Sequence, residues 1–530
     1  MKTRLSYYLC AVVAAAVILL QTNCQPTTPS PGDGKCAPCK SPATCADVTF
    51  SQQDFPPEFD YMPGNTAVFN EWVSKRNGKK IREHAWNLWV GLNQPAQGEP
   101  DKLIWQTWKT ATQAFEDSEL GPSRPMTQRL KQLTSYPDQD PNIERKPPRY
   151  MIPNCLQERY GIDTVADVKV DGCQYQFNGD VMIAGVPYNR PAFDWMRNKS
   201  QPLYLKKTLE AELAKSIAAG NPYASIGQFP DSSFVLKPML WPVKKTGYTP
   251  LPVWDNVSPE ATENNTKYPG FENQEFWKRA VAITPDTTGK PKTIDSLRFL
   301  YSVLETSSNA PLINIYPTAP VHSIQEFYHW QIDSTQLAGM SCSDRLILDL
   351  SAWWCYGRPF EADDYVVLIA MHIFSKEFPD WTMQTAWWYD KLEDSRFSGN
   401  KPKSFGGKPY GPWDKYLIAT TYGQAQKQDT SGHKAAFCDV PGGNNSDCWP
   451  VIYNPYIELG GLHPIATNCR NCHWRAGWTT DSIATNYQAM GGPTAIQTFD
   501  STNTLLFKNV IRTDFLWSIP DRVLPNPTVQ

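Results

Sequence analysis

The stretch Cys469-Arg470-Asn471-Cys472-His473 constrains its part of the chain more tightly than any other feature of the sequence. Two thiols at this spacing can each add to one vinyl group of a single haem, and the adjacent imidazole is then delivered to the iron as an axial ligand. The alternative is a disulfide, or half of a zinc site, that happens to precede a histidine. We expect one covalent haem, attached through Cys469 and Cys472, with His473 as the proximal ligand of the iron.

The N-terminus indicates export. Two basic residues precede an apolar run from Leu9 to Leu20. About 12 apolar residues cannot span a bilayer, which needs ~20, so residues 1–23 predict a signal peptide rather than a membrane helix. Cys24 then opens a stretch rich in Pro, Thr and Ser, which resembles the lipidated cysteine and tether of bacterial lipoproteins. Asn23 is bulkier than the residue usual before such a cysteine, so ordinary cleavage with Cys24 free or paired is the alternative.

The rest of the chain is expected to comprise a disordered tether over residues 24–62, a body over residues 63–449 and a haem-binding segment over residues 450–530. With 530 residues, 41% of them hydrophobic, the chain can bury a large core. A formal charge of −3 and the lack of a basic cluster argue against nucleic-acid binding. We expect a periplasmic or outer-surface protein that touches the membrane only through its lipid and exchanges electrons with redox partner proteins.

The remaining cysteines suit an oxidising compartment. Neighbours in sequence predict three disulfides, namely Cys155 with Cys173, Cys342 with Cys355, and Cys438 with Cys448. Cys36 and Cys39 have the C-x-x-C-K spacing that binds the catalytic haem in cytochrome c nitrite reductases. They lie, however, in a Pro- and Gly-rich leader without accompanying C-x-x-C-H sites, so we interpret them, with Cys45, as a small disulfide knot.

Hydrophobic periodicity predicts an α+β fold with N-terminal helices, a largely antiparallel β body and an irregular C-terminal haem segment. Helices are expected over residues 81–92, 103–115 and 205–217. Short apolar runs over residues 234–241 and 365–374 predict strands, and residues 380–388 are expected to pair with the second run. The 46 prolines indicate many irregular loops.

The second axial ligand of the iron is less constrained. Met490 is the only methionine after His473, and 17 residues of chain are long enough to reach round the haem. Its alternative role is packing at the haem edge. His463 would give bis-histidine coordination and a lower potential, or is a loop residue. His372, on the expected strand at 365–374, is a third candidate ligand and His329 a fourth, but both are interpreted as core histidines.

Twenty tryptophans are the other outlier of the composition. Those at helical spacing, Trp86, Trp89, Trp105 and Trp108, are expected in the core. Trp474 and Trp478 follow the motif and are expected to wall the porphyrin. A carbohydrate-stacking surface is the less favoured interpretation of the surplus. The acidic residues Glu361, Asp363 and Asp364 are interpreted as a solvated edge or strand cap rather than a calcium site.

The motif of Cys469, Cys472 and His473 resembles the haem-attachment site of c-type cytochromes. The longer chain, with its Trp-rich helices and terminal motif, looks like large bacterial cytochrome c family proteins. The resemblance implies an electron carrier with one haem c. The resemblance does not explain the body over residues 63–449. Two alternatives therefore remain: a haem-dependent oxidoreductase or peroxidase acting on a small molecule, and a haem-bearing sensor or binding lipoprotein.

Overall fold

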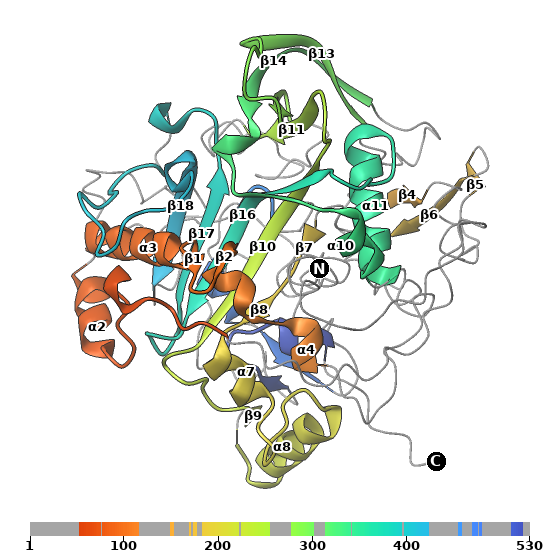
Figure 1. The fold of residues 1–530 in the computed structure, drawn as a ribbon. Coiled ribbons are helices and arrows are strands. Elements are labelled where there is room, and N and C mark those ends of the chain that lie inside the picture. The colour runs from red at the N-terminus through yellow and green to blue at the C-terminus, as the bar shows by residue number, and fades with distance from the viewer. Residues whose placement is uncertain are drawn as a thin grey trace, which may run out of the picture.

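The computed structural model describes most of the body and parts of the C-terminal segment (Figure 1). The described residues are 52–75, 77–115, 149–152, 169–170, 173–177, 183–221, 224–254, 277–300, 313–340, 342–394, 397–422, 454–457, 469–474, 476–479 and 510–522. Helices and mostly antiparallel strands are both present, which confirms the mixed α+β class.

The centre of the fold is a long antiparallel sheet in the order β18-β17-β16-β10-β8-β3, with β15 also paired to β16 and β7 to β10. Its strands are β3 (Lys109–Thr110), β7 (Ile183–Ala184), β8 (Pro187–Tyr188), β10 (Phe234–Val243), β15 (His329–Gln331), β16 (Tyr365–Ser375), β17 (Thr382–Trp388) and β18 (Tyr416–Tyr422). The predicted strands at 234–241, 365–374 and 380–388 are thus confirmed. Their sequences are mainly apolar because β10, β16 and β17 are buried along nearly their whole length.

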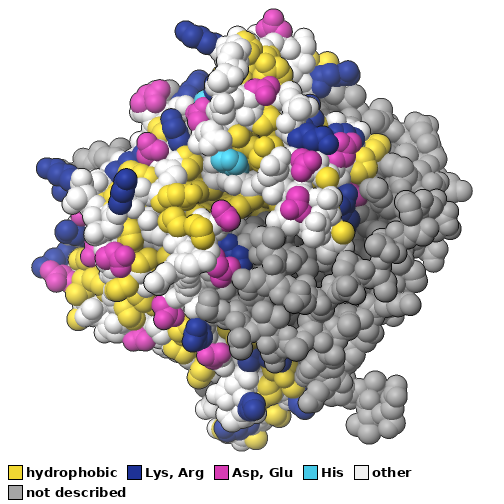
Figure 2. Space-filling model, in the orientation of Figure 1, with side chains coloured by type: hydrophobic (Ala, Val, Ile, Leu, Met, Phe, Trp, Pro, Cys, Tyr) yellow, Lys and Arg dark blue, Asp and Glu magenta, His cyan; other side chains and the backbone are white. Residues whose placement is uncertain are grey.

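A second sheet, in the order β11-β12-β14-β13, lies at the top of the view in Figure 1. Its strands are β11 (Thr249–Val253), β12 (Arg279–Thr284), β13 (Thr293–Leu300) and β14 (Ile313–Ser323). Helix α11 (Cys342–Tyr356) packs against β10, β11 and β13 and so joins the two sheets. Acidic and basic side chains are interspersed over the face seen in Figure 2.

Helix α3 (Gly78–Leu92) packs on β18 and confirms the predicted helix at 81–92. The Asn77 side chain caps it by accepting the backbone N–H of Lys80 at 3.2 Å. Helix α8 (Lys206–Ala218) confirms the prediction at 205–217. The chain turns away just after it at Gly220, whose φ of +70° suits a residue without a side chain. The other helical elements are η3 (Pro57–Phe59), α2 (Thr66–Ser74), α7 (Arg190–Met196), η7 (Ile324–Glu326), α10 (Ser334–Ala338), η8 (Leu392–Asp394), η9 (Trp413–Lys415), α12 (Cys469–His473) and α14 (Ser518–Arg522).

The predicted helix at 103–115 is wrong. Residues 104–107 form the 3-10 helix η4 (Ile104–Thr107), β3 follows, and only α4 (Ala111–Phe115) is α-helical. Tertiary hydrogen bonds, rather than a helix, fix the positions of Trp105 and Trp108. Their indole N–H groups donate to the Asn93 side chain (3.2 Å) and to the Gln53 carbonyl (2.7 Å), respectively. The remaining strands are β1 (Pro95–Ala96), β2 (Glu99–Leu103), β4 (Arg149–Ile152), β5 (Lys169–Val170), β6 (Cys173–Phe177), β9 (Ala224–Ser225), β19 (Gly477–Trp478) and β20 (Ile511–Arg512).

The folded body begins before residue 63, inside the segment predicted as tether. Phe55 and Phe59 are buried in the main hydrophobic core. A Cβ at Gly91 of α3 would come within 2.4 Å of the Phe55 ring, so this glycine permits the close approach. At the other end of the chain, Ile511 and Ile519 belong to the same core, so the described parts of the haem segment pack on the body.

The predicted disulfide between Cys342 and Cys355 is wrong. Both residues lie on α11, thirteen positions apart, which separates their Cα atoms by about 20 Å at 1.5 Å per residue. A disulfide requires Cα atoms within ~7 Å. The Cys355 thiol is instead buried and donates a hydrogen bond to the carbonyl of Pro250 at 3.4 Å. Cys155, Cys438 and Cys448, and with them the other two predicted pairs, lie outside the described residues.

Candidate haem-attachment site

The C-x-x-C-H motif forms the single helical turn α12. Residues at positions i, i+3 and i+4 of a helix share one face, which places Cys469, Cys472 and His473 on the same side of α12. Cys469 is 3% exposed, whereas the side chain of Cys472 lies outside the described part of the structure. The chain continues from His473 into β19, which pairs with β20, and β20 pairs in turn with β9.

The His473 ring is oriented by the backbone. Its Nδ1 lies 2.7 Å from the carbonyl oxygen of Phe515. Because a carbonyl only accepts, Nδ1 carries the proton and Nε2 keeps its lone pair. Burial lowers the pKa of His473 to about 4, so the imidazole is neutral at neutral pH. A histidine that ligates iron through Nε2 needs this tautomer and this kind of partner.

The acceptor carbonyl belongs to a turn in an uncommon conformation. Asp514 and Phe515 both have positive φ angles, 45° and 70°, although neither is glycine. Such residues cost about 1–3 kcal/mol each and persist where the surroundings hold them. Here the Leu516 N–H donates to the Thr513 carbonyl, and the Thr513 hydroxyl donates to the Leu516 carbonyl, both at 2.9 Å. The turn is therefore held in the shape that presents the Phe515 carbonyl to His473.

A buried ion pair anchors the same turn to the β16–β17 connection. The ammonium of Lys376 lies 2.8 Å from Asp514, and the two side chains are only 2% and 6% exposed. The second carboxylate oxygen of Asp514 accepts the Phe229 N–H at 2.8 Å, and its carbonyl accepts the Trp381 indole N–H at 3.0 Å. Burial raises the pKa of Asp514 and lowers that of Lys376, and the pairing offsets part of both effects.

Aromatic and charged side chains enclose the outer part of the site. Phe374 meets the His473 ring edge-to-face, with centroids 4.4 Å apart. The Arg470 guanidinium bonds the Asp380 carboxylate at 2.5 and 3.2 Å. Trp474 has the guanidinium carbons of Arg470 and Arg512 at 4.8 and 4.0 Å from its ring centroid, so cation–π contacts surround this indole.

Several predicted site residues cannot be placed. Met490, His463 and Cys24 lie outside the described residues, as does the Cys36 to Cys45 cluster. Within the described residues, no group of three or more His, Cys, Asp or Glu side chains could hold a metal ion.

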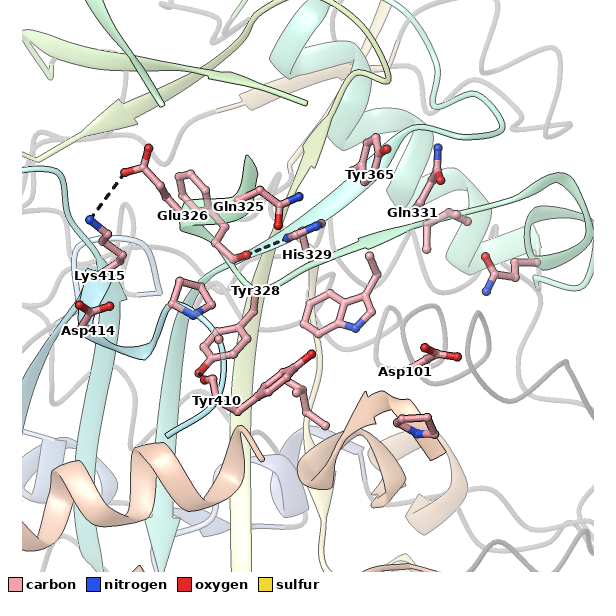
Figure 3. A pocket seen from close by; sticks show the side chains of 18 residues that line it. Asp101, Gln325, Glu326, Tyr328, His329, Gln331, Tyr365, Tyr410, Asp414 and Lys415 are labelled. Atoms are coloured by element: carbon pink, nitrogen blue, oxygen red, sulfur yellow. Dashed lines mark hydrogen bonds and ion pairs between the residues drawn. The ribbon is translucent and has the colours of Figure 1, made fainter. Parts of the chain in front are cut away.

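The two histidines predicted in the core differ. His372 is 7% exposed on β16, which confirms the prediction. His329 is only half-buried and lines an open groove, so for His329 the prediction is wrong (Figure 3). Its Nδ1 lies 2.9 Å from the Phe327 carbonyl.

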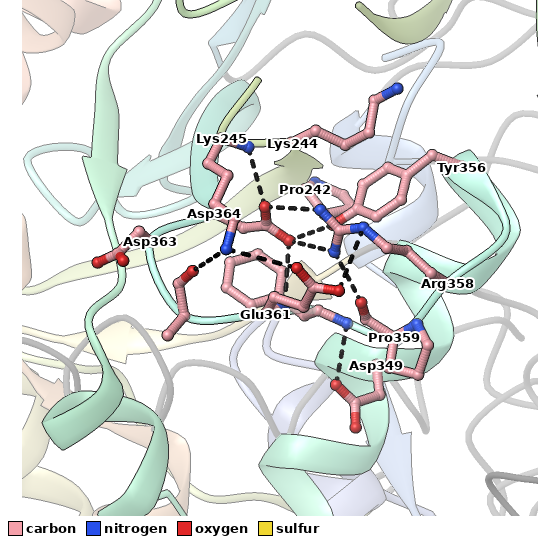
Figure 4. Close-up of polar contacts among 12 residues, drawn as sticks. Pro242, Lys244, Lys245, Asp349, Tyr356, Arg358, Pro359, Glu361, Asp363 and Asp364 are labelled. Atoms are coloured by element: carbon pink, nitrogen blue, oxygen red, sulfur yellow. Dashed lines mark hydrogen bonds and ion pairs between the residues drawn. The ribbon is translucent and has the colours of Figure 1, made fainter. Parts of the chain in front are cut away.

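The acidic residues before β16 form a strand-capping network (Figure 4). Asp364 is fully buried, and both of its oxygens accept from the Arg358 guanidinium, at 2.6 and 2.9 Å. Burial alone would raise the pKa of Asp364, but the hydrogen bonds from Arg358 and from the backbone N–H groups of Glu361 and Lys245 lower it. Asp363 remains exposed.

A buried polar cluster beside the site has no counterpart in the sequence prediction. His84 of α3 bonds the Tyr422 hydroxyl through Nδ1 at 2.8 Å and meets Glu377 through Nε2 at 3.3 Å. Glu377 also accepts from the Ser375 hydroxyl at 2.5 Å. Glu377 and Tyr422 lie 293 or more residues from His84 in the sequence, so no local pattern could have indicated this cluster.

Comparisons with protein-family models, curated proteins and solved structures find no match to this chain. In the described residues, no helix is both long and apolar enough to cross a membrane. The chemistry of the site nevertheless fits a covalently held haem. Cys469 supplies a thiol at one end of α12, and His473 supplies a neutral Nε2 at the other.

Proposed function

We propose that this chain is an exported c-type cytochrome, tethered to the membrane by a lipid on Cys24, that relays single electrons between redox partner proteins. Cys469 and Cys472 would hold one haem through thioethers, and His473 would ligate its iron. The haem, when bound, supplies a one-electron iron couple.

The hydrogen bond from His473 Nδ1 to the Phe515 carbonyl is the observation that carries the proposal. It sets the tautomer of the ligand and fixes the plane of its ring. A histidine that merely follows a disulfide would not need such a partner, whereas a histidine that binds a metal does. The edge of the His473 ring is covered by Phe374, and an apolar neighbour of this kind would favour the less charged state of an iron centre and raise its potential.

The test is expression of the full chain in bacteria that carry out c-type haem maturation. We expect a mass increase of one haem that survives denaturation, together with a pyridine-haemochrome spectrum of haem c. Cys469→Ala, Cys472→Ala and His473→Ala should each reduce covalent haem. Cys355→Ala, which removes a buried thiol outside the motif, is the matched control and should retain it.

Ligation separates electron transfer from the alternatives. Low-spin bands without CO binding in the reduced protein would support an electron carrier, and Met490→Ala or His463→Ala should then open the iron to CO. A high-spin haem that binds CO in the wild type would favour an oxidoreductase, peroxidase or sensor. A purified protein without covalent haem would refute the proposal entirely.

A further inference from the structure

A wide groove lies where β15 borders the central sheet (Figure 3). Its volume is about 890 Å³, at the upper end of the range for small-molecule sites. The walls come from β15, from residues 410–415 and from the region of β2. The groove is partly open to solvent, so a ligand longer than the groove can extend beyond it.

Aromatic rings are built rigidly into this groove. Tyr410 is 45% exposed, which makes it one of the few large apolar side chains at the surface of the described residues. Its loop is held by the Tyr328 hydroxyl, which donates to the Tyr410 carbonyl at 2.6 Å. Gly411 has a φ of +66°, and a Cβ there would lie 2.5 Å from the Tyr328 ring. Trp330 is braced by an edge-to-face contact with Trp105, with centroids 6.0 Å apart.

Polar groups flank the rings. Figure 3 shows Asp101 at one end of the groove and Asp414 at the other, with Tyr328, His329 and Tyr410 between them. The basic side chain at this site, Lys415, lies 4.0 Å from Glu326 and is partly neutralised by it.

Glu326 itself is engaged by His322 at 3.0 Å and Lys290 at 3.6 Å. Asp101 and Asp414 leave the groove with a net negative charge, which disfavours the binding of phosphate, sulfate or uronate groups. The carboxylates can accept hydrogen bonds from hydroxyl groups, and the amide of Gln325 can both accept and donate them.

We propose that this groove binds a neutral oligosaccharide. The flat faces of Tyr410 and Trp330 would cover the C–H faces of sugar rings, while Asp101, Asp414 and Gln325 bind their hydroxyls. An ammonium ligand fits less well, because Tyr328 is almost fully buried and offers no open ring face to complete a cage.

The groove is separate from the proposed haem site. Tyr365, at the start of β16, lines the groove, and Phe374, near the end of the same strand, touches His473. Nine residues of extended chain span roughly 30 Å. This proposal therefore concerns binding away from the iron and does not depend on the proposed electron transfer.

The test is calorimetric titration of the full-length protein with cellotetraose, maltotetraose, mannotetraose and N-acetylchitotetraose. We expect at least one to bind, and Tyr410→Ala to weaken its affinity about tenfold or more, because a stacked ring is lost. Ile217→Ala is the matched control, since Ile217 is 54% exposed on α8, away from the groove, and its variant should bind as the wild type does.

Three outcomes would overturn the proposal. They are no binding of any neutral tetrasaccharide at millimolar concentration, equal binding by wild type and Tyr410→Ala, and a preference for tetramethylammonium or a uronate oligomer over every neutral sugar. The circular dichroism of Tyr410→Ala should match that of the wild type, because this ring is largely at the surface.

Discussion

Removing the charge of Asp514 should destabilise the protein by about 3 kcal/mol, because Lys376 would then be buried without its counter-charge. Asn is the suitable replacement, since it has nearly the same shape and tolerates the positive φ of this position. The loss of one partner of a buried pair typically costs about 3–5 kcal/mol. We place Asp514→Asn at the lower end, because Lys376 keeps the Pro379 carbonyl (2.5 Å) and the face of Trp381 (5.1 Å) as partners.

The double variant separates charge pairing from packing. Lys376→Met combined with Asp514→Asn removes both charges, and we expect it to lie within about 1 kcal/mol of the wild type. Asp380→Asn is the matched control, because it breaks a more exposed ion pair with Arg470 and should cost less than about 1 kcal/mol. Urea unfolding followed by tryptophan fluorescence measures five proteins: the wild type, Asp514→Asn, Lys376→Met, the double variant and Asp380→Asn. Trp381, whose ring centroid lies 5.1 Å from the Lys376 ammonium, is one of the tryptophans that contribute to the signal.

A double variant that loses as much stability as the two single variants together would show that the two charges are not coupled. The carboxylate and ammonium would then contribute independently, and Asp514 could not be said to hold the turn through its charge. An Asp514→Asn variant that loses no more stability than Asp380→Asn would likewise rule out a strong buried ion pair.

Two further predictions concern pH and the capping network. Burial alone would raise the pKa of Glu326, but His322 and Lys290 lower it from 4.5 to about 2, so its stabilising effect is complete above pH 4.5 and is lost as the pH falls to about 2. Glu326→Gln should therefore cost ~1–2 kcal/mol at pH 7, allowing for solvent screening, and almost nothing near pH 2; a constant difference in acid titrations of thermal stability would contradict this. Asp364→Asn should cost about 3 kcal/mol in thermal unfolding, because Arg358 loses a buried bidentate partner, whereas Asp363→Asn on the exposed neighbour should be neutral; equal effects would rule out the network.

The helices and strands that were predicted correctly are those whose sequence pattern lies within the element itself. The runs at 234–241 and 365–374 are mainly apolar because both faces of their strands are buried, and a pattern of that kind is visible without knowing the partners. The region 103–115 was predicted wrongly because Trp105 and Trp108 have helical spacing, whereas their indole N–H groups are bound by Asn93 and Gln53, which both come earlier in the chain. Tertiary hydrogen bonds here override the periodicity.

The haem motif shows the same division. Cys469 to His473 is recognisable because its chemistry is contained in five consecutive residues. The partner of His473 is a backbone carbonyl 42 residues away, and a carbonyl leaves no signature in a sequence. Lys376 and Asp514 are 138 residues apart and resemble ordinary surface charges until the fold buries them together.

Strand β16 connects the features that matter most for function. At its start, Asp364 caps the strand and Tyr365 lines the groove. Near its end, Phe374 contacts His473, and Lys376 then anchors the turn that orients the same histidine. Because this strand is buried along its length in a close-packed sheet, the two ends are held at a constant separation rather than moved together. A ligand in the groove should therefore position the protein without altering the proposed iron site, so oligosaccharide binding should leave the reduction potential unchanged.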